Sequence, residues 1–355
     1  MDYRAESNAL DAEVLGLIER WHKTGEPPGE ERFNALALRL FDYQLRYNGP
    51  YARYCKRLGV TAPRSWDEIP GVPAAAFKEA ALATFDPASA ALAFETSGTT
   101  AGTAGRHFME TPALYDAALL GAFDRYVLAG ARLRYFNFVP DPARRPQSSL
   151  GYMMARISER RGAGRTGWYL RGDELPVDEF IADVGDAISA GQPICVAATA
   201  FALVALLDAL DQRRIELALP EGSLVMQTGG FKGRSRVVER GELFARIART
   251  FGIESKAIVS EYGMTELSSQ YYATGDGAYA APPWLRARVV GPDRATLAPG
   301  TVGSLLHLDL ANRSSCIAIQ TEDLGMQTPD GLRLLGREGE ASLRGCSLDA
   351  EALRA

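Results

Sequence analysis

Strand-like and helix-like segments alternate along the chain from residue 133 to residue 264. The strand-like segments are LRYFNFV, TGWYL, ICVAA, SLVMQTGG and KAIVSEYGM, and helix-like segments such as VDEFIADVGDAIS lie between them. Because strand–helix–strand connections within one sheet are right-handed, this alternation predicts an α/β fold with a doubly wound, mainly parallel sheet. Ligands of such sheets bind beyond the carboxyl ends of the strands. QTGG (227–230) and SEYGMTE (260–266), which end predicted strands, are therefore candidate site segments.

The sequence on either side of this alternation has a different pattern. Residues 8–58 carry apolar residues at helical spacing, interrupted at residues 48–50. Beyond about residue 285, short strand-like runs and turns indicate a small antiparallel β unit. We therefore expect an N-terminal helical region packed on the main domain (1–80), an α/β core (81–284), a small β subdomain (285–335) and a C-terminal tail (336–355).

Composition excludes several classes of protein. The 355 residues include 46% hydrophobic residues, and the formal net charge of −5 argues against an extended nucleic-acid footprint. No apolar run reaches the ~20 residues of a membrane span, and the acidic, amphipathic N-terminus does not read as a signal peptide. We therefore expect a cytoplasmic protein with reduced thiols. The four cysteines form no CxxC pair and the three histidines are scattered, which argues against a structural zinc site.

The segment ETSGTTAGTAGRHF (95–108) is crowded with glycine, serine and threonine. Glycines let backbone N–H groups point at an anion, and hydroxyl groups add further donors. The segment lacks the Gly-Lys-Ser/Thr ending of a P-loop, so kinase-type phosphate chemistry is not indicated. Two interpretations of the composition remain, a phosphate-binding loop and a polar surface loop.

SEYGMTE combines three side chains suited to a nucleotide. Tyr262 can stack on a base, Thr265 can donate a hydrogen bond to a phosphate, and Glu266 can ligate Mg²⁺. Taken alone, the segment is also compatible with an ordinary turn between a strand and a helix.

Five motifs in order resemble those of the adenylate-forming (ANL) superfamily, which includes acyl-CoA synthetases and peptide-synthetase adenylation domains. They are SGTT (97–100), TGG (228–230), YGMTE (262–266), TEDLG (321–325) and GREGEASLRG (336–345), which resembles the hinge motif. A narrower similarity, from about residue 30 to the end, is to the acyl-protein synthetase (LuxE-like) family and to phenazine-antibiotic adenylating proteins. It rests on FNFVPDPARRPQSSLGYM, QTGGFKGRSR and GREGEASLRGCSLDAEAL.

The resemblance implies ATP and Mg²⁺ as ligands and assigns a role to each matching residue. The SGTT loop would surround the β- and γ-phosphates, Tyr262 would lie against adenine, and Thr265 would touch the α-phosphate. Glu266 would ligate Mg²⁺, while Asp323 and Arg337 would hold the ribose. The implied cofactor-binding set is Ser97, Gly98, Thr99, Thr100, Gly229, Gly230, Tyr262, Gly263, Met264, Asp323 and Arg337, and the implied catalytic residues are Cys346, Thr265 and Glu266.

Cys346 lies in RGCSL, between Arg344 and a serine that can cap a following helix. An arginine and a helix N-terminus both lower the pKa of a thiol, which favours the nucleophilic thiolate. The resemblance to acyl-protein synthetases implies that Cys346 accepts the acyl group as a thioester. The alternative is a small buried hydrophobic residue.

The sequence departs from the superfamily pattern in two places. Ala101 is inserted before Gly102. Arg106 occupies the basic position of the loop motif, where lysine is common in the superfamily. The superfamily's C-terminal domain of about a hundred residues, which normally brings a catalytic lysine, is expected to be truncated here. Lys232 or Lys78 could replace that lysine, although lone lysines are also typical of solvated surface charges.

The resemblance implies an AMP-forming ligase that activates a carboxylic acid and passes the acyl group through Cys346 to a partner protein, such as a reductase, or to a small-molecule acceptor. One alternative is an aryl or heteroaromatic acid-adenylating enzyme of antibiotic biosynthesis without a thioester. A further alternative is a non-catalytic nucleotide-binding module. Apolar residues around 135–155 and 195–205 could line a pocket for a fatty or an aromatic acid, so the sequence does not identify the acid.

Overall fold

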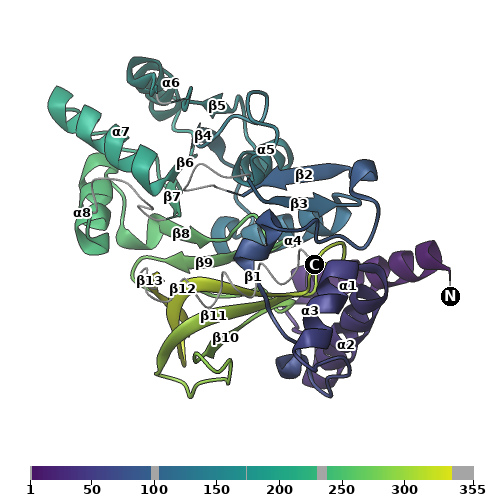
Figure 1. Ribbon diagram of the computed structural model, residues 1–355. Coiled ribbons are helices and arrows are strands. Elements are labelled where there is room, and N and C mark those ends of the chain that lie inside the picture. Colours follow the sequence, from purple (N-terminus) through teal and green to yellow (C-terminus); the bar gives the residue numbers. More distant parts are fainter. Residues whose placement is uncertain (1, 97–103, 173, 230–237, 338–355) are drawn as a thin grey trace. The chain divides into compact units, whose positions relative to one another are not determined.

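The computed structural model describes residues 2–96, 104–172, 174–229 and 238–337 (Figure 1). Packing divides the chain into two compact units. Unit 1 takes in the described residues among 1–122, 264–270 and 278–355, and unit 2 those among 123–263 and 271–277. Each unit combines segments that are far apart in the sequence. The four consecutive regions expected from the sequence therefore do not correspond to these units one to one, and they stay a prediction.

Unit 2 is built around a six-stranded sheet with the strand order β5-β4-β6-β7-β8-β9. The first five strands are parallel, and β9 runs antiparallel to β8. This confirms the mainly parallel sheet predicted from the alternation of segments. The strands are β4 (Arg134–Phe138), β5 (Gly167–Trp168), β6 (Ile194–Thr199), β7 (Leu224–Thr228), β8 (Ile258–Tyr262) and β9 (Tyr271–Thr274).

Helices connect these strands and bury one face of the sheet. Phe136, Val196, Val225 and Ile258 from four strands pack with apolar residues of α6, α7 and α8 in one core, and Figure 1 shows these helices beside the sheet. Thr199 is the last residue of β6 and the N-cap of α7. Its side chain accepts a hydrogen bond from the N–H of residue 202, which stabilises the first turn of the helix. The helices are α5 (Ser149–Arg161), α6 (Val177–Ser189), α7 (Ala200–Arg213) and α8 (Arg240–Phe251), with a π-helical turn (Asp124–Leu128) and a 3-10 turn (Ser255–Ala257).

Unit 1 joins N-terminal helices to strands from the far end of the described chain. Its five-stranded sheet has the path β1-β12-β11-β10, and β13 also pairs with β12. The pairs among β10 to β13 are antiparallel, which confirms the β unit predicted after residue 285. The helices are α1 (Tyr3–Thr24), α2 (Glu30–Tyr47), α3 (Gly49–Arg57) and α4 (Ala113–Phe123), with 3-10 turns at Trp66–Glu68, Ala74–Lys78 and Pro87–Ser89. The strands are β1 (Val72–Pro73), β2 (Leu92–Glu95), β3 (Arg106–Met109), β10 (Leu285–Val290), β11 (Val302–Asp309), β12 (Ala318–Thr328) and β13 (Gly331–Arg337).

None of the helices in the described part of the chain has the length and apolar character that a bilayer crossing requires.

The connection between β11 and β12, residues 310–317, is buried and mostly irregular. Gln44 of α2 donates hydrogen bonds to the carbonyls of residues 312 and 313, at 2.9 and 3.1 Å. Arg313 has a side chain that is 2% exposed, and it binds both carboxylate oxygens of Asp11 at 2.7 and 2.8 Å. It also pairs with Glu110. These polar contacts connect the N-terminal helices to the C-terminal sheet of unit 1.

We expect Arg313→Met to lower the free energy of unfolding by about 3 to 5 kcal/mol, because it leaves two carboxylates without their buried partner. Chemical denaturation would measure the change. The matched control is Arg39→Met, which removes an ion pair with Glu13 whose two side chains are 53% and 43% exposed. The control should cost less than about 1 kcal/mol, and equal costs for the two variants would contradict the structural role of Arg313.

Candidate active site

Hydrogen bonds hold the base of the glycine-rich loop in unit 1. Strands β2 and β3 pair antiparallel with Glu95 opposite Arg106. Beyond that pair, the Thr96 N–H donates to the Gly105 carbonyl at 2.8 Å, and the Gly105 N–H donates to the Thr96 hydroxyl at 3.1 Å. A Cβ at residue 105 would lie 2.8 Å from the backbone carbonyl of Phe77, so glycine is required there. The two ends of the loop are therefore fixed side by side.

Thr265 lies against this loop base. Its hydroxyl donates to the Glu95 carbonyl at 3.4 Å, and its own carbonyl accepts a hydrogen bond of 2.7 Å from Nδ1 of His107 on β3. The next residue, Glu266, is 9% exposed. The structure thus brings together two motifs that are more than 150 residues apart in sequence.

Arg106 forms an exposed ion pair of 3.2 Å with Glu95. An exposed pair contributes little to stability, so the guanidinium can exchange this partner for an anion at little cost. The basic position of the motif therefore carries a usable charge.

Asp323 and Arg337 lie opposite each other on the paired strands β12 and β13 of unit 1. The antiparallel register of β12 and β13 makes these two residues direct Cα partners. The side chain of Asp323 is buried, with the residue 8% exposed. The strand register therefore makes the two residues predicted to hold the ribose neighbours along the paired backbones.

In unit 2, the parallel pair β7 and β8 places Thr228 directly beside Glu261. The Thr228 hydroxyl donates to the Glu261 carboxylate. Gly229 follows with φ +69°, a left-handed conformation that favours glycine. Tyr262 ends β8, and its ring lies 5.6 Å from the ring of Tyr271. Gly229 and Tyr262 therefore leave the same edge of the sheet, as the sequence predicted.

Glu261 is a buried carboxyl group that the sequence analysis did not single out. Burial raises its pKa to about 7, although the hydrogen bond from Thr228 opposes the shift. The available signal was a glutamate inside the apolar strand AIVSEY, directly before the tyrosine of the motif. His107 on β3 is a second buried ionisable group, and it is fully buried. Burial lowers the pKa of the His107 imidazole to about 4, against the hydrogen bond to Thr265.

Several predicted residues lie outside the described part of the chain: Ser97, Gly98, Thr99, Thr100, Gly230, Lys232 and Cys346. Lys78, the other candidate lysine, is exposed at the end of a 3-10 turn. The three described cysteines, Cys55, Cys195 and Cys316, are buried. Burial raises the pKa of each of their thiols, that of Cys55 to about 12, so they are poor nucleophiles.

Glu266 is the carboxylate that the resemblance assigns to Mg²⁺, and it is 9% exposed. Among these residues, no group of three or more His, Cys, Asp or Glu side chains is arranged to hold a metal. Mg²⁺ is commonly bound through one or two carboxylates together with substrate phosphates. Glu266, which follows Thr265 directly in the sequence, is compatible with that single-carboxylate role.

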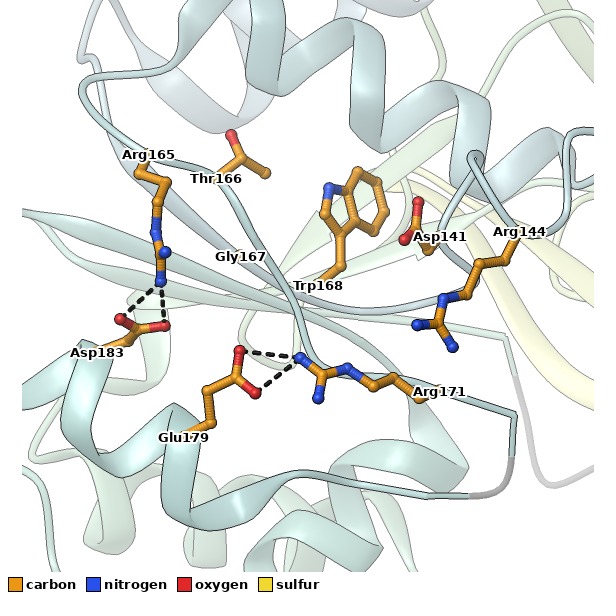
Figure 2. Close-up of a pocket in the computed structure, with 9 residues that line it drawn as sticks. All are labelled: Asp141, Arg144, Arg165, Thr166, Gly167, Trp168, Arg171, Glu179 and Asp183. Carbon is orange, nitrogen blue, oxygen red and sulfur yellow. Dashed lines mark hydrogen bonds and ion pairs between the residues drawn. The ribbon is translucent and has the colours of Figure 1, made fainter.

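A cavity of about 280 Å³ opens at the β5 edge of unit 2 (Figure 2). Arg165 binds Asp183 with two hydrogen bonds of 2.9 and 2.8 Å. Arg171 binds Glu179 in the same way, at 2.9 and 2.7 Å. The charges around the cavity balance, and no predicted site residue contributes to it. Its lining residues are Asp141, Arg144, Arg165, Thr166, Gly167, Trp168, Arg171, Glu179 and Asp183.

Some of the apolar residues that could line an acid pocket pack in the core of unit 2. Phe136 and Phe138 of β4, and Val196 and Ala198 of β6, belong to the core beneath α6, α7 and α8. These four side chains pack in that core, and their lining of an acid pocket stays a prediction.

We expect Glu261→Gln to become progressively more stable than the wild type as pH rises. The folded-state pKa of about 7 lies above the ordinary glutamate pKa of 4.5, so the wild type loses stability as pH rises from 4.5 through 7. Glutamine keeps an oxygen for the Thr228 hydroxyl but does not ionise. Urea denaturation at pH 5 and pH 8 should show a relative change of about 2 kcal/mol. A difference independent of pH would contradict a buried, protonated Glu261.

The sequence matches the family described as acyl-protein synthetase, LuxE, over residues 24–352. No curated protein matches the chain. Solved structures match it at identities that show a common fold. The 2-hydroxyisobutyryl-CoA ligase in complex with 2-HIB-AMP and CoA is 15% identical with a TM-score of 0.64, over 88% of this chain and 69% of that chain.

Two other structures share the fold. McyG A-PCP complexed with phenylalanyl-adenylate is 15% identical with a TM-score of 0.51, over 72% of this chain and 48% of that chain. ATP-bound MatB from Rhodopseudomonas palustris is 16% identical with a TM-score of 0.50, over 72% of this chain and 49% of that chain. The chain thus spans about half the length of these two proteins, and the fold expected from the adenylate-forming resemblance is confirmed. Because the family match extends over most of the sequence, the chain belongs to the LuxE acyl-protein synthetase family.

Proposed function

We propose that the protein activates a carboxylic acid with ATP and forms an acyl-adenylate. The observation that carries the proposal is the contact of Thr265 with the base of the glycine-rich loop, at Glu95 and His107. Two motifs to which the resemblance assigns phosphate binding converge there. Family membership supports the same reaction.

In the first step, a carboxylate oxygen of the acid attacks the α-phosphorus of ATP. The bond from that phosphorus to the oxygen bridging the α- and β-phosphates breaks, and pyrophosphate leaves with the electron pair. No protein nucleophile is needed, so catalysis consists of positioning and of stabilising charge on the phosphate oxygens. We assign the α-phosphate to Thr265 and the β- and γ-phosphates to the SGTT loop, residues 97–100.

The remaining contacts would fix the nucleoside. Tyr262 would stack on adenine, with Gly229 and Gly230 allowing a close approach of the backbone. Asp323 would accept hydrogen bonds from the ribose hydroxyls, with Arg337 beside it. Glu266 would hold Mg²⁺, which supplies positive charge at the phosphate oxygens when bound. Gly263 and Met264 complete the cofactor-binding set.

In the second step, the thiolate of Cys346 attacks the carbonyl carbon of the acyl-adenylate. The bond between that carbon and the phosphate oxygen breaks, AMP leaves, and a thioester remains. The three described cysteines support this assignment indirectly, since their buried thiols have raised pKa values. The acyl group would then pass to a partner protein, such as a reductase.

Release of pyrophosphate from ATP and Mg²⁺, measured with a panel of fatty and aromatic acids, tests the first step. We expect release with at least one acid, and Asp323→Ala should raise the KM for ATP about 10- to 100-fold through loss of charged hydrogen bonds. Asp330→Ala, which changes an exposed aspartate in the turn after β12, is the matched control and should leave KM unchanged. No release with any acid would contradict the proposal and favour a nucleotide-binding module.

Mass measurement of the denatured protein after incubation with the accepted acid and ATP tests the second step. We expect an acyl adduct on the wild type and on Cys195→Ala, and none on Cys346→Ala. An adduct that persists in Cys346→Ala would refute the thioester. Pyrophosphate release without any adduct would favour the alternative, an enzyme that hands an aryl or heteroaromatic acid directly to its acceptor in antibiotic biosynthesis.

A further inference from the structure

Residues 264–270, which contain Thr265 and Glu266, form no helix or strand. Residues 267–270 are nevertheless buried. A buried irregular segment cannot satisfy its backbone within regular secondary structure and must find other partners. The identity of those partners determines how precisely the two site residues are held.

Two side chains bind the backbone carbonyls of the site residues themselves. Nδ1 of His107 donates to the Thr265 carbonyl at 2.7 Å, and Nδ2 of Asn312 donates to the Glu266 carbonyl at 2.9 Å. Oδ1 of Asn312 also accepts from the Ser268 hydroxyl at 2.8 Å. Consecutive carbonyls are thus held from two different elements, β3 and the connection between β11 and β12.

Asp309, at the end of β11, holds the next part of the segment. One of its carboxylate oxygens accepts from the Ser268 N–H at 2.9 Å, and the other accepts from the Ser269 hydroxyl at 2.8 Å. The second oxygen also accepts from the Ala311 N–H at 3.0 Å, which fixes the carboxylate itself. His107, Asp309 and Asn312 are at most 1% exposed, so water does not compete for these bonds.

The hydrogen bond to a carbonyl determines the tautomer of His107. A carbonyl oxygen only accepts, so Nδ1 carries the proton of the neutral ring. Burial lowers the pKa of the imidazole to about 4, although its bond to Thr265 opposes the shift, and the ring is therefore neutral near pH 7. Nε2 has no hydrogen-bond partner within the described ranges. The donor at Nδ1 can therefore be separated experimentally from the acceptor at Nε2.

We propose that His107, Asn312 and Asp309 are positioning residues that fix the backbone of residues 264–270 and thereby the side chains of Thr265 and Glu266. The inference rests on the proposed role of these two residues in adenylation. Small displacements of groups that act in a transition state have large effects on rate. The three residues would therefore govern turnover without touching the substrate.

Three variants of His107 separate the two possible roles of the ring. Asparagine places an amide N–H near the position of Nδ1, glutamine places its amide near Nε2, and leucine places no polar group at either. We expect His107→Leu and His107→Gln to lower kcat for acid-dependent pyrophosphate release about 100-fold, with a smaller change in the KM for ATP. His107→Asn should recover kcat to within about tenfold of the wild type. Rescue by glutamine instead of asparagine, or equal activity of all three variants, would overturn the proposal.

Tyr51→Phe is the matched control. It also removes one buried side-chain donor to a backbone carbonyl of unit 1, that of Pro70 at 2.9 Å, away from residues 264–270. The lost bond is of similar strength, but it does not hold residues 264–270, so kcat should stay within about threefold of the wild type. A loss of kcat equal to that of His107→Leu would mean that general destabilisation explains both, and would overturn the positioning role.

Hydrogen–deuterium exchange without ligands provides a readout that does not depend on activity. Peptides covering residues 264–270 should exchange about tenfold faster in His107→Leu and Asn312→Ala than in the wild type or Tyr51→Phe. Unchanged exchange in both variants would overturn the proposal. If the wild type releases no pyrophosphate with any acid, the proposed function fails, while the exchange data still test whether these side chains hold the segment.

Discussion

Unit 1 depends on the pairing of polar groups inside a buried, irregular connection. Residues 310–317 bring a guanidinium, an amide and several backbone carbonyls into the interior, where an unpaired polar group is costly. Arg313 meets two carboxylates, Asn312 meets the Glu266 carbonyl, and Gln44 covers two further carbonyls. These bonds are directional, whereas apolar contacts are not. The connection therefore specifies which helices, hairpin and site segment can assemble around it.

Much of unit 2 could be predicted from the sequence. Periodicity reports local burial, and the segments from residue 133 onward carry it plainly: the predicted helix 177–189 coincides with α6, and the predicted strands fall on β4, β6, β7 and β8. The antiparallel unit after residue 285 was predicted for the same reason. The pairing of β1 with β12 was not, because Val72–Pro73 is only two residues long and its partner lies more than 240 residues away. Local pattern carries no information about such a pair.

Some residues of the candidate site could likewise be predicted from the sequence, and others could not. The resemblance to known motifs implied the residues of the loop, of YGMTE and of TEDLG, and the strand register makes Asp323 and Arg337 direct partners. The buried ionisable groups could not be predicted. Glu261 and Asp309 acquire raised pKa values, and His107 a lowered one, only because distant elements exclude water from them. A resemblance gives the roles of matched residues, but the partners that hold them come from the packing of this particular chain.

The discontinuity of unit 1 has a consequence for synthesis of the chain. A ribosome makes the chain from its N-terminus, so α1, α2 and α3 emerge long before the connection at 310–317 that accepts their buried polar groups. The strands of unit 2 are complete by residue 274. Unit 2, whose sequence lies within that of unit 1, therefore has all its strands synthesised first. Until residues 310–317 are made, the inward faces of the N-terminal helices lack these partners. Nascent chains of intermediate length are accordingly the species with the greatest need of chaperones.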